Sequence, residues 1–145
     1  MKLAFASDHA GSGLKNALLA AAQAAGHECL NLGVNDRNSV DYPMMAQKLV
    51  DAMAGGAIER GVLVCGSGIG ISIAANRAPH IRCALVHDAT AARLCREHND
   101  ANVIAFGERL IGEAVAIDAL GAFLTTEFAG GRHQRRVDML AGSQG

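Results

Sequence analysis

Short β-rich runs alternate along this chain with longer segments of helical period, and this alternation constrains the fold more than any other feature. Strands are predicted over residues 2–7, 28–32, 61–65, 82–86 and 102–105, and helices over residues 13–25, 42–54, 68–77, 89–98 and 110–126. When each strand is followed by a helix, right-handed crossovers place helices on both faces of a parallel sheet. We therefore predict an α/β fold in which the apolar third strand lies at the centre.

The end of the chain predicts one further helix, over about residues 132–141, because the Gly130-Gly131 pair ends the helix before it. Arg132 and Arg136 lie one turn apart on a single face of this helix, where they can grip a phosphate, although a solvated basic face is the ordinary explanation. The length of 145 residues fits one domain, residues 1–145. The complete fold prediction is a three-layer α/β/α Rossmann-like sandwich with a five-stranded parallel sheet and an extra C-terminal helix.

Charge and composition exclude several classes of partner. A formal net charge of −1 argues against nucleic acid, and no apolar run approaches the roughly 20 residues of a membrane span. The four cysteines form no CxxC pair and no signal peptide precedes Lys2, so we expect a soluble, reduced, cytoplasmic protein. The chain has no HExxH motif and no Cys/His cluster with zinc spacing, and we expect neither a metal nor another cofactor.

The candidate reactive group is the thiol of Cys65. It ends the predicted central strand and precedes the turn Gly66-Ser67-Gly68-Ile69-Gly70 and an apolar helix, whose N-terminus favours a thiolate. The glycines let the backbone approach a ligand and direct several N–H groups to one point, as an oxyanion requires. The other three cysteines lack such surroundings and are interpreted as structural.

Other functions of this turn are weighed against the residues present. A dinucleotide fingerprint needs glycine at position 71, and a cysteine phosphatase needs arginine there, but the residue is Ile71. Two alternatives stay open: a nucleotide-binding or regulatory module, in which Asp88 follows the turn by about 20 residues, and a cysteine hydrolase that uses Cys65, His98 and Asn99.

Further polar residues follow the predicted strands and helices. Asp8-His9 ends the first strand and is expected at the same edge of the sheet as Cys65, because parallel strands share a carboxyl end. Asp41-Tyr42-Pro43 opens a helix in the manner of a cap. His98-Asn99 follows the fourth helix, so its side chains need not face the ligand edge in their own subunit. Capping explains each of these motifs equally well when it is taken alone.

Taken together, these motifs resemble type B ribose-5-phosphate isomerases, whose wider family includes allose-6-phosphate and galactose-6-phosphate isomerases. The resemblance covers nearly the whole chain, in order and at compatible spacing. It is carried by Ser7-Asp8-His9-Ala10-Gly11, Asp41-Tyr42-Pro43, residues 65–76, Arg96-Glu97-His98-Asn99, Phe106-Gly107-Glu108-Arg109 and Arg132-His133-Gln134-Arg135-Arg136.

The resemblance implies a metal-free interconversion of ribose 5-phosphate and ribulose 5-phosphate, a phosphorylated aldose and ketose, through a cis-enediolate. Cys65 would be the base, and Asp8 would contact the sugar hydroxyls and move protons between oxygens. Ser67 and the N–H groups of the loop, which includes Gly66, Gly68 and Gly70, would hold the oxyanion. Many relatives carry threonine at the position of Ser67. A six-carbon sugar phosphate, such as allose 6-phosphate, is the alternative substrate.

The same resemblance implies a site shared between two subunits. His98, assisted by Tyr42, would open the furanose ring, and Asn99 would steady the enediolate. The phosphate clamp would consist of His9, Arg109, Arg132 and Arg136. The smallest active unit would then be a homodimer, in which the C-terminal helix docks on the partner subunit, with a tetramer of two dimers as the larger option.

Overall fold

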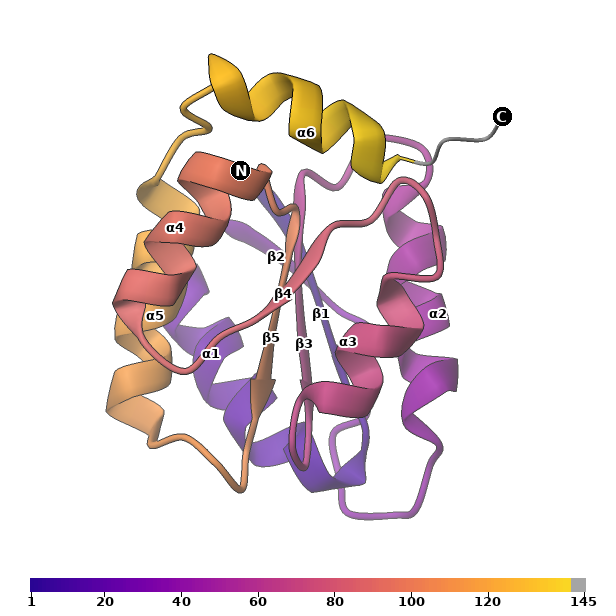
Figure 1. The fold of residues 1–145 in the computed structure, drawn as a ribbon. Helices are drawn as coiled ribbons and strands as arrows, with labels where there is room; N and C mark the ends of the chain where they lie inside the picture. The colour runs from indigo at the N-terminus through magenta and orange to yellow at the C-terminus, as the bar shows by residue number, and fades with distance from the viewer. Residues whose placement is uncertain (142–145) are drawn as a thin grey trace.

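The computed structural model describes residues 1–141 and contains a five-stranded sheet in which every neighbouring pair of strands is parallel. The order across the sheet is β2-β1-β3-β5-β4, so the predicted parallel sheet is confirmed and its third strand is central. The strands are β1 (Lys2–Ser7), β2 (Glu28–Asn31), β3 (Arg60–Cys65), β4 (Cys83–Leu85) and β5 (Val103–Gly107) (Figure 1).

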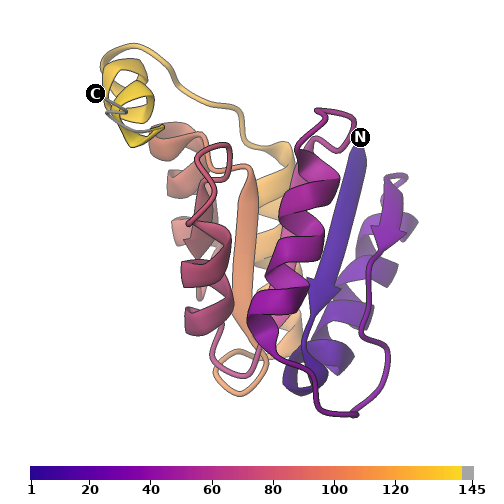
Figure 2. The same cartoon turned by 90° about the vertical axis from the view of Figure 1, so that its right-hand side faces the viewer.

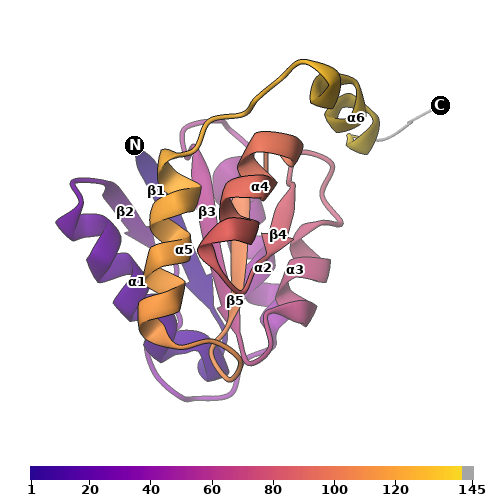
Figure 3. The ribbon, with the colours of Figure 1, turned by 60° about the vertical axis from the view of Figure 1, so that its left-hand side comes forward.

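Helices cover both faces of this sheet. One face carries α1 (Ser12–Ala24), α4 (Ala89–Asn99) and α5 (Glu113–Thr125), which come forward in Figure 3. The other carries α2 (Tyr42–Met53) and α3 (Ile69–Ala75), which face the viewer in Figure 2. A short 3-10 helix, η1 (His9–Gly11), follows β1, and α6 (Arg132–Leu140) lies across the end of the sheet where the strands begin (Figure 1).

The core is divided by the sheet into two apolar layers. In β1, Leu3 and Phe5 pack into the layer beneath α1 and α5, whereas Ala4 and Ala6 pack into the layer beneath α2 and α3. All of β5, and β3 from its second residue onward, are buried, as expected for strands covered on both faces. No helix among residues 1–141 is long and apolar enough to cross a membrane.

Several predicted boundaries were wrong by one to three residues. The last strand was expected at residues 102–105 but runs from Val103 to Gly107, because the Asn102 side chain is used in the connection: its Oδ1 accepts the Arg82 N–H at 2.8 Å. The helix expected from residue 110 begins at Glu113, because Gly112 is extended. The helix expected at residues 68–77 is Ile69–Ala75, since Gly68 has a left-handed backbone.

Candidate active site

The carboxyl ends of β1 and β3 form the point at which the chain changes direction across the sheet. From β1 the chain turns outward to β2, and it then returns to place β3 on the other side of β1. Open α/β sheets bind ligands at such a switch point. A cavity of about 340 Å³ lies there, lined by the predicted site residues Asp8, His9, Tyr42, Cys65, Gly66, Ser67, Gly70 and Arg109.

Cys65 is the last residue of β3, and its side chain contributes to the cavity although the residue is only 4% exposed. Its Sγ accepts a hydrogen bond from the Gly68 N–H at 3.1 Å. Gly68 has φ of +76°, and a Cβ there would lie 2.8 Å from the Phe106 carbonyl carbon, so only glycine fits. A donor fixed on the sulfur stabilises negative charge there. Gly68, which was predicted to bind substrate, does not line the cavity.

The turn after Cys65 supplies donors to the cavity. Ser67 Oγ accepts the Ile69 N–H at 3.2 Å, which holds the hydroxyl over the turn. The N–H groups of Ser67 and Gly70 have no acceptor among residues 1–141, so they are available to a ligand. The Gly66 carbonyl accepts the Arg109 N–H at 3.0 Å and thereby ties the segment after β5 to this turn.

The two carboxylate oxygens of Asp8 have different surroundings. Its Oδ1 accepts the N–H groups of Ala10 and Gly11, at 3.0 and 3.1 Å, and so caps η1. The Oδ2 atom makes no hydrogen bond within residues 1–141 and is the oxygen that a ligand can use. Asp8 can therefore cap η1 and bind a ligand at the same time, because each role uses a different oxygen.

His9 is oriented by the connection between β2 and α2, residues 32–41. Its Nδ1 accepts the Val40 N–H at 3.1 Å, which places the proton of the neutral ring on Nε2. Its carbonyl accepts a hydrogen bond from Arg37 at 2.7 Å. His9 therefore offers an Nε2–H donor, which suits an anionic or hydroxyl oxygen.

Glu108 and Arg37 are supporting residues that the sequence interpretation missed. Glu108 Oε1 accepts the Leu14 N–H at 2.7 Å at the start of α1, and Oε2 pairs with Arg37 at 2.9 Å. This bridge joins the segment after β5 to α1 and to the 32–41 connection. The signal was present in Phe106-Gly107-Glu108-Arg109, where only Arg109 was assigned a role.

Another cavity, of about 290 Å³, contains three of the other predicted residues and lies at the opposite edge of the sheet. His98, Asn99 and Arg136 line it, together with His133, between the end of α4 and α6. The His98 and His133 rings stack with centroids 4.5 Å apart. Desolvation, and then the charges of His98 and of neighbouring arginines, lower the pKa of His133. Arg132 does not line this cavity.

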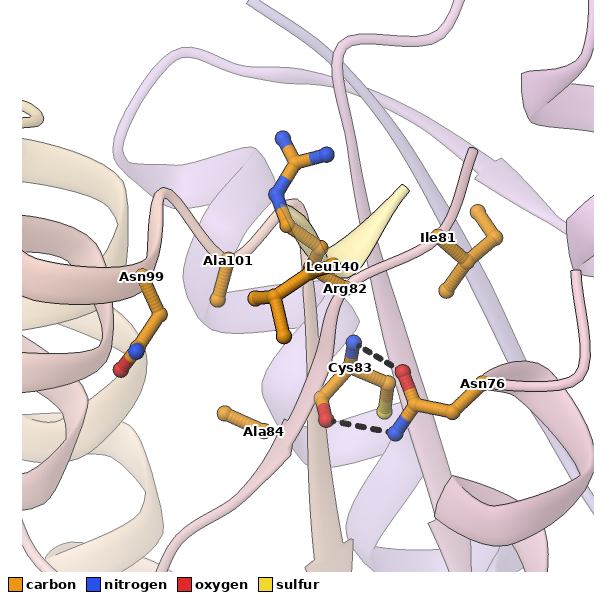
Figure 4. A pocket seen from close by; sticks show the side chains of 8 residues that line it. All are labelled: Asn76, Ile81, Arg82, Cys83, Ala84, Asn99, Ala101 and Leu140. Carbon is orange, nitrogen blue, oxygen red and sulfur yellow. Dashed lines mark hydrogen bonds between the residues drawn. The ribbon is translucent and has the colours of Figure 1, made fainter. Parts of the chain in front are cut away.

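A further cavity of about 370 Å³ adjoins the one at His98 and shares Asn99 and Leu140 with it (Figure 4). One polar contact in its lining supports the sheet. The Asn76 carboxamide accepts the Cys83 N–H at 2.7 Å and donates to the Cys83 carbonyl at 2.9 Å, so it pairs with the edge of β4. Of the predicted site residues, this cavity contains Asn99 alone.

The remaining cysteines and the metal-ligating residues do not form a rival centre. Desolvation raises the pKa of Cys83 to about 12 and that of Cys95 to about 11, and it also raises the pKa of Cys29. At neutral pH these three side chains are thiols. No three His, Cys, Asp or Glu side chains within residues 1–141 are grouped so that they could hold a metal ion.

The geometry does not favour the two alternative functions. Asp88 caps α4 by accepting the Ala91 N–H at 2.7 Å, and it follows β4, which is separated from β3 by β5. It therefore does not lie beside the glycine turn, as a ribose-binding carboxylate would. A hydrolase would need Cys65 and His98 together, but one chain places them in different cavities.

Known proteins resemble this chain over almost its entire length. The family model for Ribose/Galactose Isomerase matches residues 3–140. Escherichia coli ribose-5-phosphate isomerase B is 41% identical, over 96% of this chain and 93% of its own. The Bacillus subtilis putative sugar phosphate isomerase YwlF is 44% identical, over 97% and 95%. The structure of Clostridium thermocellum ribose-5-phosphate isomerase B gives a TM-score of 0.95 at 42% identity, over 97% and 95%. The chain belongs to the ribose/galactose isomerase family.

Proposed function

We propose that this protein is an aldose–ketose isomerase that interconverts ribose 5-phosphate and ribulose 5-phosphate. The relatives from E. coli and C. thermocellum are named for this activity and share almost the whole chain. The observation that carries the proposal is the cavity at the switch point, where a cysteine sulfur with a fixed N–H donor lies beside a carboxylate and free backbone N–H groups.

The isomerisation needs only proton transfers. In the forward direction the Cys65 thiolate removes the proton from C2 of the open-chain aldose, and the electrons left behind form a cis-enediolate. The resulting thiol returns the proton to C1, while a second proton moves from the C2 oxygen to the C1 oxygen. Asp8 Oδ2 is the proposed relay for this second proton, and the N–H groups of Ser67 and Gly70 stabilise the oxyanion.

The phosphate is the part of the substrate that fixes its direction in the cavity. His9 and Arg109 both line the cavity, and His9 presents its Nε2–H because Nδ1 is occupied by Val40. An N–H donor and a guanidinium are suitable partners for a phosphate dianion. We assign these two residues to the near half of the phosphate clamp.

The far half of the site is proposed to come from a second copy of the chain. His98, Asn99, Arg132 and Arg136 lie at the amino-terminal edge of the sheet, remote from Cys65 of their own chain. In a homodimer that pairs opposite edges, the partner's α6 would add arginines to the clamp, and the partner's His98 with Tyr42 would open the sugar ring. Such dimers can act alone or pair into a tetramer.

A cytoplasmic location is part of the same proposal. None of the four cysteines forms a disulfide, as is usual in a reducing compartment; they are Cys29, Cys65, Cys83 and Cys95. A reducing compartment also keeps Cys65 out of a disulfide, in which its sulfur could not accept and return a proton.

Replacing Cys65 by serine tests the proposed base. We expect kcat for ribulose 5-phosphate formation to fall on the order of 10²-fold or more, because a positioned proton-transfer group is lost. Exchange of substrate hydrogen with heavy water, followed by NMR, should fall in parallel. The Cys29→Ser variant, changed at a cysteine outside the cavity, is the matched control. Near-normal turnover by Cys65→Ser would refute the assignment.

The six-carbon alternative is favoured by one observation, namely that the matching family model is described for both ribose and galactose isomerases. A comparison of kcat/KM for ribose, allose and galactose phosphates decides between them. We expect ribose 5-phosphate to give the highest kcat/KM. A higher kcat/KM for a hexose phosphate would identify that sugar phosphate as the substrate instead.

A further inference from the structure

Lys15 is a fully buried lysine on α1 that the proposed mechanism does not use. It is 0% exposed, and its Nζ donates to Asn31 Oδ1 at 2.9 Å and to Asn35 Oδ1 at 2.7 Å. No carboxylate within residues 1–141 forms an ion pair with it. Burying an ammonium with only carboxamide partners is costly, and desolvation lowers the pKa of Lys15 to about 8. This unfavourable burial directs attention to the two asparagines that the lysine holds in place.

The two asparagines form a closed network with Lys15 at the start of the 32–41 connection. Asn31 Oδ1 also accepts the Gly33 N–H at 2.9 Å, and Asn31 Nδ2 donates to Asn35 Oδ1 at 2.9 Å. Both carboxamides therefore have their oxygens turned toward the lysine. An apolar side chain of the same length would leave both oxygens without their charged donor.

The connection held by this network reaches the cavity at the switch point. Gly33 and Val34 exchange backbone hydrogen bonds with Ser7, the residue before Asp8, at 2.8 and 2.9 Å. Farther along, Val40 donates to His9 Nδ1, and the connection ends at Asp41, directly before the first residue of α2, Tyr42. The segment that Lys15 holds thus bonds to Ser7 and His9 and leads directly into Tyr42, and both His9 and Tyr42 line the cavity.

We propose that Lys15 is a positioning residue for the active site. Its ammonium holds Asn31 and Asn35, this network fixes the 32–41 connection, and the connection sets the tautomer of His9 and the place of Tyr42. The inference rests on the proposed function only where it assigns His9 and Tyr42 to the substrate. Lys15 itself does not touch the substrate.

The test compares Lys15→Met with Lys48→Met, which removes the same charge from an exposed position on α2. In Lys15→Met we expect amide exchange at residues 33–40 to accelerate by about tenfold or more, while exchange in β3 and β5 is unchanged. The ¹⁵N NMR signal of the His9 ring should lose its fixed Nε2–H form. With ribose 5-phosphate, KM should rise by about tenfold, and kcat should change less. Lys48→Met should match the wild type in every measurement.

A second variant tests the same network if Lys15→Met fails to fold. Asn35→Ala breaks the network from its exposed end, and it should reproduce the faster exchange and the higher KM. The double variant Lys15→Met/Asn35→Ala should be no worse than Lys15→Met, because both changes remove the same interaction. Unchanged exchange at residues 33–40, additive effects, or a loosened connection with unchanged KM would each overturn the proposal. The exchange and His9 measurements use no substrate, so they keep their meaning if the wild type fails to act on ribose 5-phosphate.

Discussion

Gly70 shows how closely single residues are fitted around the cavity. A Cβ at this position would lie 2.6 Å from Tyr42 Cζ and 2.7 Å from Tyr42 Cε1. The Tyr42 ring therefore lies against the bare backbone of the first turn of α3, on the wall of the cavity. Because Tyr42 is 40% exposed, its ring can swing outward when it is pushed. Position 70 thus affects where the ring lies more than it affects whether the chain folds.

We expect Gly70→Ala to separate activity from stability. The free energy of unfolding should change by less than about 1 kcal/mol, since only an exposed ring must move, whereas kcat/KM should fall by at least about tenfold as the ring leaves the cavity wall. Denaturant unfolding and steady-state kinetics measure the two quantities. Gly121→Ala in α5 is the control, because a Cβ there meets nothing within 4 Å. Normal kinetics in Gly70→Ala would show that the position of Tyr42 is unimportant.

The sequence predicted which side chains lie close together where the topology of the backbone alone determines it. Asp8 and Cys65 were placed at one edge because parallel strands share a carboxyl end, and the cavity contains both. The Glu108 bridge and the Lys15 network were not predicted. Both involve the 32–41 connection, which has no periodicity from which its path could be derived. Asp41 occupies the N-cap position of α2, as expected, but its side chain makes no capping hydrogen bond.

At the scale of whole elements, the position of α6 depends on a buried arginine at the end of α4. Arg96 is 6% exposed; it donates to the Thr126 carbonyl at 3.0 Å and the Ala101 carbonyl at 2.7 Å, and it pairs with Asp100 at 2.9 Å. The Ala129 N–H adds a bond to the Glu97 carbonyl. These contacts fix the segment between α5 and α6, and α6 carries the two arginines assigned to the clamp.

Arg96→Met should therefore damage both stability and substrate binding. Losing the guanidinium leaves the Ala101 and Thr126 carbonyls without their donor, and each buried group left unsatisfied costs about 1–3 kcal/mol in the free energy of unfolding. KM for the sugar phosphate should also rise, because α6 loses its anchor. Arg93→Met is the matched control, since Arg93 pairs with Glu97 on an exposed helix face, where such pairs contribute about 0.5 kcal/mol. Equal effects of the two substitutions in urea unfolding would contradict this role for Arg96.

The order and type of the elements were predictable, but their ends were not. The strands and helices appear where hydrophobic periodicity indicated them, because apolar residues must face the core whatever the local detail. The ends depend on individual side chains, such as Asn102 before β5, or on a backbone conformation, such as that of Gly112 before α5. The short edge strand β4 similarly depends on Asn76, whose carboxamide occupies its open edge. None of these contacts has a periodic signature.

Across the whole molecule, the candidate site is divided between opposite edges of one sheet. Cys65 and Asp8 lie where the strands end, and His98 and Arg136 lie where they begin, near α6 (Figure 1). No movement of side chains can unite residues that the sheet itself separates. If both groups act on one substrate, they must come from different chains. In a symmetric dimer each interface would then contain two complete sites.

Mixing two inactive variants tests this arrangement. Cys65→Ser and His98→Gln should each be nearly inactive as homodimers, but a mixed dimer joins the intact Cys65 of one chain with the intact His98 of the other. After equal amounts are unfolded and refolded together, we expect about a quarter of the wild-type activity, because about half of the dimers are mixed and each has one intact site. Cys65→Ser mixed with Asp8→Asn is the control and should recover nothing, since both changes affect the same edge. Equal recovery in the two mixtures, or none in either, would show that the site is not shared between subunits.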